Sequence, residues 1–189
     1  MRKILITSAV SLDGYMEGPD RDISWHRVDA ELHRHLNELL APVSAFIDGR
    51  VTHQLMAGYW PTADQDPAAT REIVDFAEIW RSKKKYVFSR TLEDAGPGTE
   101  IVREFDPGWV RELKAASGAD MALGGANLMA QFMRHGLIDE YRLYLNPVVI
   151  GGGTPLFPPD LTLDLRLIET RPFNDGVVEL TYRPGPNRS

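Results

Sequence analysis

Segments with the apolar spacing of strands alternate along the chain with segments whose apolar residues recur at helical spacing. Strands are predicted at 3–10, 43–47, 85–89, 100–104, 120–123 and 141–150. Helices are predicted between them, beginning at Asp29, Val51, Asp66, Gly108 and Ala126. Two last strands, 163–170 and 177–183, flank the turn sequence Asn174-Asp175-Gly176. The alternation favours an α/β fold with a mixed, mostly parallel sheet, and the final pair predicts an antiparallel C-terminal edge.

The domain organisation follows from length and from the distribution of breakers. A chain of 189 residues is the size of one compact domain and can bury a sufficient core by itself. No repeat and no linker interrupts the alternation. A single domain is therefore predicted over 1–183, followed by a flexible tail over 184–189 that is rich in proline and glycine.

Composition and charge exclude several classes of function. The chain has no cysteine, so disulfides, thiolate metal sites and cysteine nucleophiles are absent. Its 21 basic and 27 acidic residues give a net charge of −6, which argues against a nucleic-acid partner. No apolar stretch approaches the length of a membrane helix, no signal peptide is evident, and a cytoplasmic protein is expected. His33 and His35 lie on different sides of a helix and make no metal pair, and no metal site is predicted.

Three strand ends carry residues suited to an anionic ligand. They comprise Gly49, Arg50 and Thr52 at the first; Ser89 and Arg90 at the second; and Gly124, Gly125, Ala126, Asn127 and Leu128 at the third. Glycine permits a tight turn into a helix, and the free N–H groups of that helix attract an anion that arginine can also bind. Each feature alone is typical of a turn or a solvated arginine. Because ligands of open α/β sheets bind beyond the carboxyl ends of the strands, the three together favour a dinucleotide, and the two arginines favour NADP over NAD.

The same three junctions, in the same order, resemble dihydrofolate reductase. Two further stretches, Ser11-Leu12-Asp13-Gly14 and 150–157, are more similar to the C-terminal reductase domain of the bifunctional riboflavin-biosynthesis deaminase–reductase and its single-domain bacterial relatives. The resemblance covers residues 3–182. It implies a three-layer dihydrofolate-reductase-like fold with an eight-stranded sheet and helices on both faces, NADPH as cofactor, and a homodimer.

The resemblance also implies roles for individual residues. Gly49, Arg50 and Thr52 would hold the adenosine phosphate side of NADPH, Ser89 and Arg90 the 2′-phosphate, and Gly124 to Leu128 the pyrophosphate. Asp13 is the candidate catalytic residue, with a simple Asp-Gly turn as the alternative. Asn146 is the candidate substrate-binding residue.

The implied activity is the NADPH-dependent reduction of a small heterocycle, similar to that of 5-amino-6-(5-phosphoribosylamino)uracil reductase. A pterin reductase of the dihydrofolate reductase type is an alternative, for which Ala30 or Glu31 would occupy the position of the proton-donating acid. A non-catalytic NADP-binding module is another. The basic residues Arg21, His26, Arg27, His33, Arg34 and His35 form either the wall of a substrate pocket or a solvated face. The segment 61–67 is either a lid or a connector.

Overall fold

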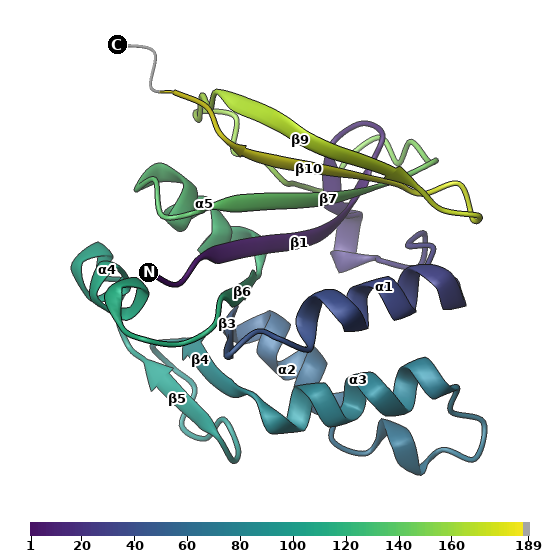
Figure 1. Ribbon diagram of the computed structural model, residues 1–189, viewed down its shortest axis with the longest axis horizontal. Helices are drawn as coiled ribbons and strands as arrows, with labels where there is room; N and C mark the ends of the chain where they lie inside the picture. Colours follow the sequence, from purple (N-terminus) through teal and green to yellow (C-terminus); the bar gives the residue numbers. More distant parts are fainter. Residues whose placement is uncertain (187–189) are drawn as a thin grey trace.

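The computed structural model describes residues 1–186, and its centre is one eight-stranded sheet (Figure 1). In spatial order the strands are β5 (Thr99–Val102), β4 (Lys84–Phe88), β3 (Ala45–Gly49), β6 (Met121–Gly124), β1 (Ile4–Ser11), β7 (Glu140–Asn146), β10 (Val178–Pro184) and β9 (Leu165–Pro172). The pairings from β5 to β7 are parallel, and β10 runs antiparallel to both of its neighbours. The predicted α/β class, with its antiparallel C-terminal edge, is confirmed.

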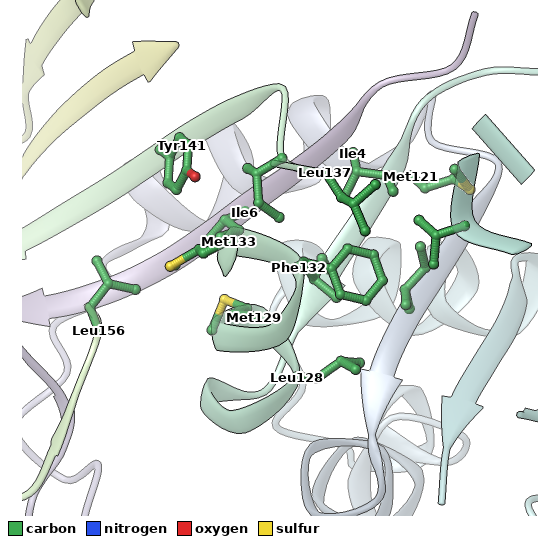
Figure 2. Close-up of a cluster of buried hydrophobic side chains, with 14 of the residues drawn as sticks. Ile4, Ile6, Met121, Leu128, Met129, Phe132, Met133, Leu137, Tyr141 and Leu156 are labelled. Atoms are coloured by element: carbon green, nitrogen blue, oxygen red, sulfur yellow. The ribbon is translucent and has the colours of Figure 1, made fainter. Parts of the chain in front are cut away.

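Helices cover both faces of this sheet, which makes three layers. They are α1 (Ala30–Leu40), α2 (Arg50–Tyr59) and α3 (Arg71–Ser82) on one face, and α4 (Pro107–Ala115) and α5 (Ala126–Arg134) on the other (Figure 1). Strand alternation divides the apolar residues between the layers: Ile4 and Ile6 face α5, and Leu5 faces α1 and α3. Figure 2 shows the larger core, where Phe132 and Met129 of α5 pack beside Ile6. Burying each such side chain contributes roughly 1.5–3 kcal/mol.

Element boundaries differ from the sequence prediction where a side chain or proline decides them. Helix α3 begins at Arg71 because Thr70 caps it, whereas the predicted start, Asp66, accepts the N–H of Ala68 in a separate turn. Strand β7 ends at Asn146 because Pro147, the next residue, has no N–H to continue a ladder. Helix α2 begins at Arg50, one residue before the predicted start at Val51, and continues to Tyr59.

The small sheet formed by β2 (Tyr15–Glu17) and β8 (Thr154–Pro155) was not predicted. It joins two segments far apart in the sequence, and it closes the loop after β1 onto the loop after β7. Each strand is too short to show the alternation of apolar and polar residues by which a strand is predicted.

The chain end and the 61–67 segment are both attached to the body of the domain. Pro184 pairs with Leu165 as the last residue of β10, and the N–H of Gly185 donates to the Asp164 carbonyl, so the predicted flexible tail cannot begin at 184. The rest of that prediction falls partly on 187–189, outside the described residues. A short 3-10 helix, Ala63–Gln65, lies in the 61–67 segment, and Arg81 holds Asp64 there through two hydrogen bonds, of 2.9 and 2.7 Å. In this arrangement the segment joins α2 to α3 and is held against α3.

Candidate functional site

A cleft of about 1190 Å³ lies between the strand ends and the helices α1 and α2. Its walls come from the junctions after β3, β4 and β6, from the loop that follows β2, and from one side of α1. Ligand pockets usually measure about 300–1,000 Å³, so this cleft has room for more than one small ligand.

The structure brings the ten predicted cofactor residues together in this cleft. They are Gly49, Arg50, Thr52, Ser89, Arg90, Gly124, Gly125, Ala126, Asn127 and Leu128. Parallel neighbours explain the convergence, because β3 pairs with both β4 and β6 and the carboxyl ends of the three strands meet at one edge. Their binding of a cofactor stays a prediction.

Two helices point uncapped N-termini into the cleft. Helices α2 and α5 begin after Gly49 and Gly125, and neither glycine can supply a capping side chain. The other three α-helices of the described chain each have a side-chain cap, from Asp29, Thr70 and Asp106. The first N–H groups of α2 and α5 therefore lack a side-chain acceptor, and they form the electropositive ends that bind phosphate in other α/β proteins.

Glycine is required at the β6–α5 junction because the neighbouring elements approach it closely. A Cβ atom on Gly124 would lie 2.6 Å from Oδ1 of Asp48, and one on Gly125 would lie 3.1 Å from Oγ1 of Thr52. Gly125 also has φ of +94°, which L side chains rarely adopt. The starts of α2 and α5 can therefore lie this close together only because residues 124 and 125 are glycine.

The β4 junction presents an arginine on a turn held by internal hydrogen bonds. Oγ of the buried Ser89 accepts the N–H groups of Thr91 and Leu92, at 3.3 and 3.0 Å. Arg90 is exposed, and its side chain makes no hydrogen bond or ion pair within residues 1–186. Sequence analysis missed Arg103, whose Nη1 donates to the carbonyls of Ser89 and Leu92 and so holds the turn from outside. No local pattern identifies Arg103, because its partners lie in the turn that follows another strand, β4.

Asn146 lines the cleft, but both ends of its amide are already bonded. Its Oδ1 accepts the N–H of Arg27 at 2.7 Å and its Nδ2 donates to the Tyr144 carbonyl at 3.0 Å, and the residue is fully buried. The geometry makes Asn146 a positioning residue that fixes the loop before α1 to the end of β7.

Asp13 is not among the residues that line the cleft, and its catalytic role stays a prediction. It is exposed, its Oδ1 accepts the N–H of Ile150 at 3.2 Å, and its Oδ2 accepts the N–H of Gly151 at 2.8 Å. The hydroxyl of Ser11 and these backbone groups hold the pKa of the carboxyl below its usual value of 3.8. Asp13 therefore connects the turn after β1 to the loop after β7. This structural role resembles the alternative given above, in which Asp13 is part of a simple Asp-Gly turn.

The other candidates, from the opening loop and the first helix, divide between residues that line the cleft and residues that do not. Arg21, His26, Arg27 and His33 line the cleft. Arg34 and His35 do not, because they pair with Glu72 and Glu179 at 2.7 and 2.8 Å. Glu31 accepts a hydrogen bond from Asn174 and faces the β9–β10 turn, so it does not supply an acid to the cleft. The single carboxyl group among the cleft-lining residues is that of Glu17.

Asp48 lies buried directly beneath the two glycine turns. Burial raises the pKa of its carboxyl from 3.8 to about 7, although the positive charge of Lys85 acts in the opposite direction. Lys85 is itself buried, with its ammonium group 4.1 Å from the ring centre of Trp80, and burial lowers its pKa. The charge state of this pair therefore depends on pH near neutrality.

The raised pKa of Asp48 predicts a pH-dependent stability. Between about pH 4 and pH 7 the folded chain keeps a proton that the unfolded chain releases, so this group lowers the free energy of unfolding as pH rises, by at most about 1.4 kcal/mol per unit. Asp48→Asn is expected to gain stability relative to the wild type as pH rises from about pH 4 to pH 7, measured by urea unfolding. The exposed control Asp20→Asn should follow the wild type. Parallel profiles for wild type and Asp48→Asn would contradict the argument.

Comparison with known proteins identifies the family. The family model described as the RibD C-terminal domain matches residues 2–179. The chain belongs to the RibD C-terminal domain family. The resemblance to the riboflavin-pathway type of reductase domain is thus confirmed.

Relatives of this RibD C-terminal domain protein include both uncharacterized and named proteins. The uncharacterized protein YyaP of Bacillus subtilis is 34% identical over 183 residues, which cover 96% of this chain and 94% of YyaP. The structure of a putative riboflavin biosynthesis protein from Shewanella sp. PV-4 is similar with a TM-score of 0.73 and 23% identity, over 98% of this chain and 100% of that one. The structure of a dihydrofolate reductase from Enterococcus faecalis, in a complex with NADP(H), is similar with a TM-score of 0.65 and 12% identity, over 97% of each chain. The dihydrofolate-reductase-like fold is confirmed.

A third solved structure is that of the Thermotoga maritima diaminohydroxyphosphoribosylaminopyrimidine deaminase/5-amino-6-(5-phosphoribosylamino)uracil reductase. It has a TM-score of 0.67 and 16% identity, and the match covers 97% of this RibD C-terminal domain and 57% of that chain.

Within residues 1–186, none of the helices combines the length and apolarity needed to cross a bilayer. The same residues hold no group of three histidine or acidic side chains placed to bind a metal.

Proposed function

We propose that this protein is an NADPH-dependent oxidoreductase that reduces a small heterocyclic substrate. The observation that carries the proposal is the convergence of two uncapped glycine helix starts and an unpaired arginine on one cleft. The family supports a reductase, and the Enterococcus dihydrofolate reductase, which shares the fold, binds NADP(H).

The residues of the cleft fit the chemical groups of NADPH. The first N–H groups of α2 and α5 would bind its pyrophosphate and adenosine phosphate, with glycine allowing close approach of the backbone. Arg90 would bind the 2′-phosphate, because its guanidinium is unpaired and stands on a turn held by Ser89 and Arg103. When bound, NADPH supplies a hydride from its nicotinamide, and the protein's contribution is to orient donor and acceptor and to exclude water.

The two alternative functions, a pterin reductase and a non-catalytic NADP-binding module, place different requirements on the cleft. A pterin reductase needs an acid beside its substrate, and Glu31, the residue in register, faces the β9–β10 turn. Glu17 lines the cleft, with its carboxylate accepting the hydroxyl of Thr154 at 2.8 Å. A non-catalytic NADP-binding module would bind NADPH without oxidising it in the presence of any heterocycle or imine.

The first test is calorimetric titration with NADPH and with NADH, on the wild type and on Arg90→Ala. The wild type is expected to prefer NADPH by about tenfold to 100-fold, the worth of a charge-assisted hydrogen-bonded pair, and Arg90→Ala should lose that preference. Arg111→Ala, an exposed arginine of α4 outside the cleft, is the matched control and should behave as the wild type. Equal affinity for both cofactors in the wild type, or no binding of either, would refute the proposal.

The homodimer implied by the resemblance stays a prediction. The face of β7 and β10 away from α1 carries an apolar groove lined by Leu143, Leu145, Leu165, Leu180 and Tyr182. A second copy of the chain is an occupant that suits such a surface. Sedimentation equilibrium measures the mass in solution directly.

A further inference from the structure

The cleft is divided into two parts of different chemistry. The part at the strand ends has the helix starts and Arg90 described above. The other part lies between the 22–28 loop and α1 on one side and α2 on the other, and its lining is mostly apolar. We call it the apolar arm and define it by Ile23, Val28, Leu36, Leu55, Tyr59 and Trp60.

Exposed apolar side chains concentrate in the cleft, and most of them lie in this arm. Val51, Leu55 and Tyr59 are spaced four residues apart, so they form one stripe along α2, and they are 37%, 62% and 49% exposed. Ile23 and Val28 are likewise exposed and line the same cleft from the opposite loop. Five of the eleven large apolar side chains exposed within residues 1–186 thus lie on this cleft. Exposed apolar groups gathered in a concave surface indicate a ligand that covers them.

The inner end of the arm is aromatic. Trp60 and Phe76 both line the cleft and pack edge to face, with ring centres 4.4 Å apart. Tyr59 packs against Trp60 at 4.8 Å. Aromatic rings fixed by such packing offer rigid apolar surface to a flat ring system at a small cost in conformational entropy.

The arm lacks the uncapped helix starts of the strand-end part, because Asp29 caps α1. Arg27 donates its Nη1 to the Asp175 carbonyl, at 3.1 Å. Burial lowers the pKa of both His26 and His33, which favours their neutral forms. Glu17 adds a carboxylate. Arg21 and Arg27 are cations exposed at the rim, whereas the strand-end part of the cleft combines Arg90 with two uncapped helix starts.

We infer that the second ligand of the cleft is an uncharged heterocycle with a flat, apolar substituent that occupies the apolar arm, rather than a substrate that carries a ribose phosphate. The inference rests on the proposed function for its assignment of the strand-end part to NADPH. It narrows the substrate class: the reducible ring would lie toward the strand ends, and the apolar substituent would extend between α1 and α2.

The test uses N-phenyl-1-naphthylamine, an uncharged aromatic fluorophore, and ribose 5-phosphate as probes. The fluorophore is expected to bind the wild type with increased emission, and Leu55→Ser should weaken its binding about tenfold, because most of the apolar area of that side chain is lost. The matched control is Leu167→Ser on β9, since Leu167 is 50% exposed and outside the cleft. It should leave binding unchanged. Ribose 5-phosphate should not displace the fluorophore.

Parallel calorimetry with NADPH separates this inference from the proposed function. Leu55→Ser is expected to bind NADPH as the wild type does, because Leu55 lies more than a turn beyond the α2 start. Fluorophore binding that depends on Leu55 in a protein without NADPH affinity would refute the cofactor assignment and still support an apolar arm. Fluorophore binding that is unchanged in Leu55→Ser, or displacement by ribose 5-phosphate that is lost in Arg21→Ala, would overturn the inference.

Discussion

Gly125→Ala is expected to weaken NADPH binding about 100-fold. The residue has φ of +94°, and an added Cβ would lie 3.1 Å from Thr52 Oγ1 and 3.3 Å from the backbone nitrogen of Gly49. Because both contacts belong to the opposite helix start, the side chain would push α2 and α5 apart and misalign the N–H groups proposed to bind the pyrophosphate. Titration calorimetry measures the loss, and thermal unfolding should show a cost of about 1–2 kcal/mol from the backbone conformation.

Gly136→Ala is the matched control for this variant. Gly136 follows α5, has φ of +61°, and has nothing within 4 Å of an added Cβ. Alanine there incurs a similar backbone cost of about 1–2 kcal/mol, but it lies outside the cleft and should leave NADPH affinity unchanged. If the two variants lost affinity equally, the effect would come from general destabilisation and the phosphate-binding role of the junction would be wrong.

Gly153→Ala is expected to lower the free energy of unfolding by about 3 kcal/mol and to open the loop after β1. Gly153 has φ of +134°, and an added Cβ would overlap the carbonyl oxygen of Glu17 and lie 2.8 Å from Cα of Gly18. These are backbone atoms, so the clash is relieved only by separating β2 from β8. Met16 and Glu17 line the cleft, and faster amide exchange over 15–18 should accompany the loss of stability.

The control for the loop is Gly151→Ala, two residues away. Gly151 also has positive φ, +76°, yet an added Cβ meets nothing within 4 Å. Its cost should be the backbone conformation alone, about 1–2 kcal/mol, with amide exchange at 15–18 as in the wild type. Similar exchange in both variants would show that the approach of Gly153 to Glu17 does not hold the loop closed.

The junction residues could be predicted from sequence because their chemistry is local. A glycine followed by a helical pattern specifies a turn and an uncapped helix start wherever the segment lies, as Gly49 and Gly125 do. Parallel strand order then brings such turns to one edge. Boundaries such as the start of α3 were missed because Asp66 and Thr70 are both suitable caps, and packing of the helix selects between them.

Residues whose partners are distant in sequence could not be assigned in this way. Asp13 is exposed in a turn, and only the position of Ile150 and Gly151 shows that its carboxylate is bound to backbone outside the cleft. Likewise, only the tertiary structure shows that Arg103 donates a hydrogen bond to the carbonyl of Ser89. The stripe of Val51, Leu55 and Tyr59 is visible in the sequence, but an identical stripe serves in any helix that faces a core.

The sequence by itself determined the fold class, the family and the residues of the three junctions, because strand and helix periodicity, glycine turns and helix starts depend on neighbours along the chain. The tertiary structure alone decided which carboxylates face the cleft, why residues 124 and 153 must be glycine, and that the α2 stripe lies open to a ligand. Those properties depend on the distance between segments more than 30 residues apart, such as Asp48 and Gly124, and no local pattern encodes that distance.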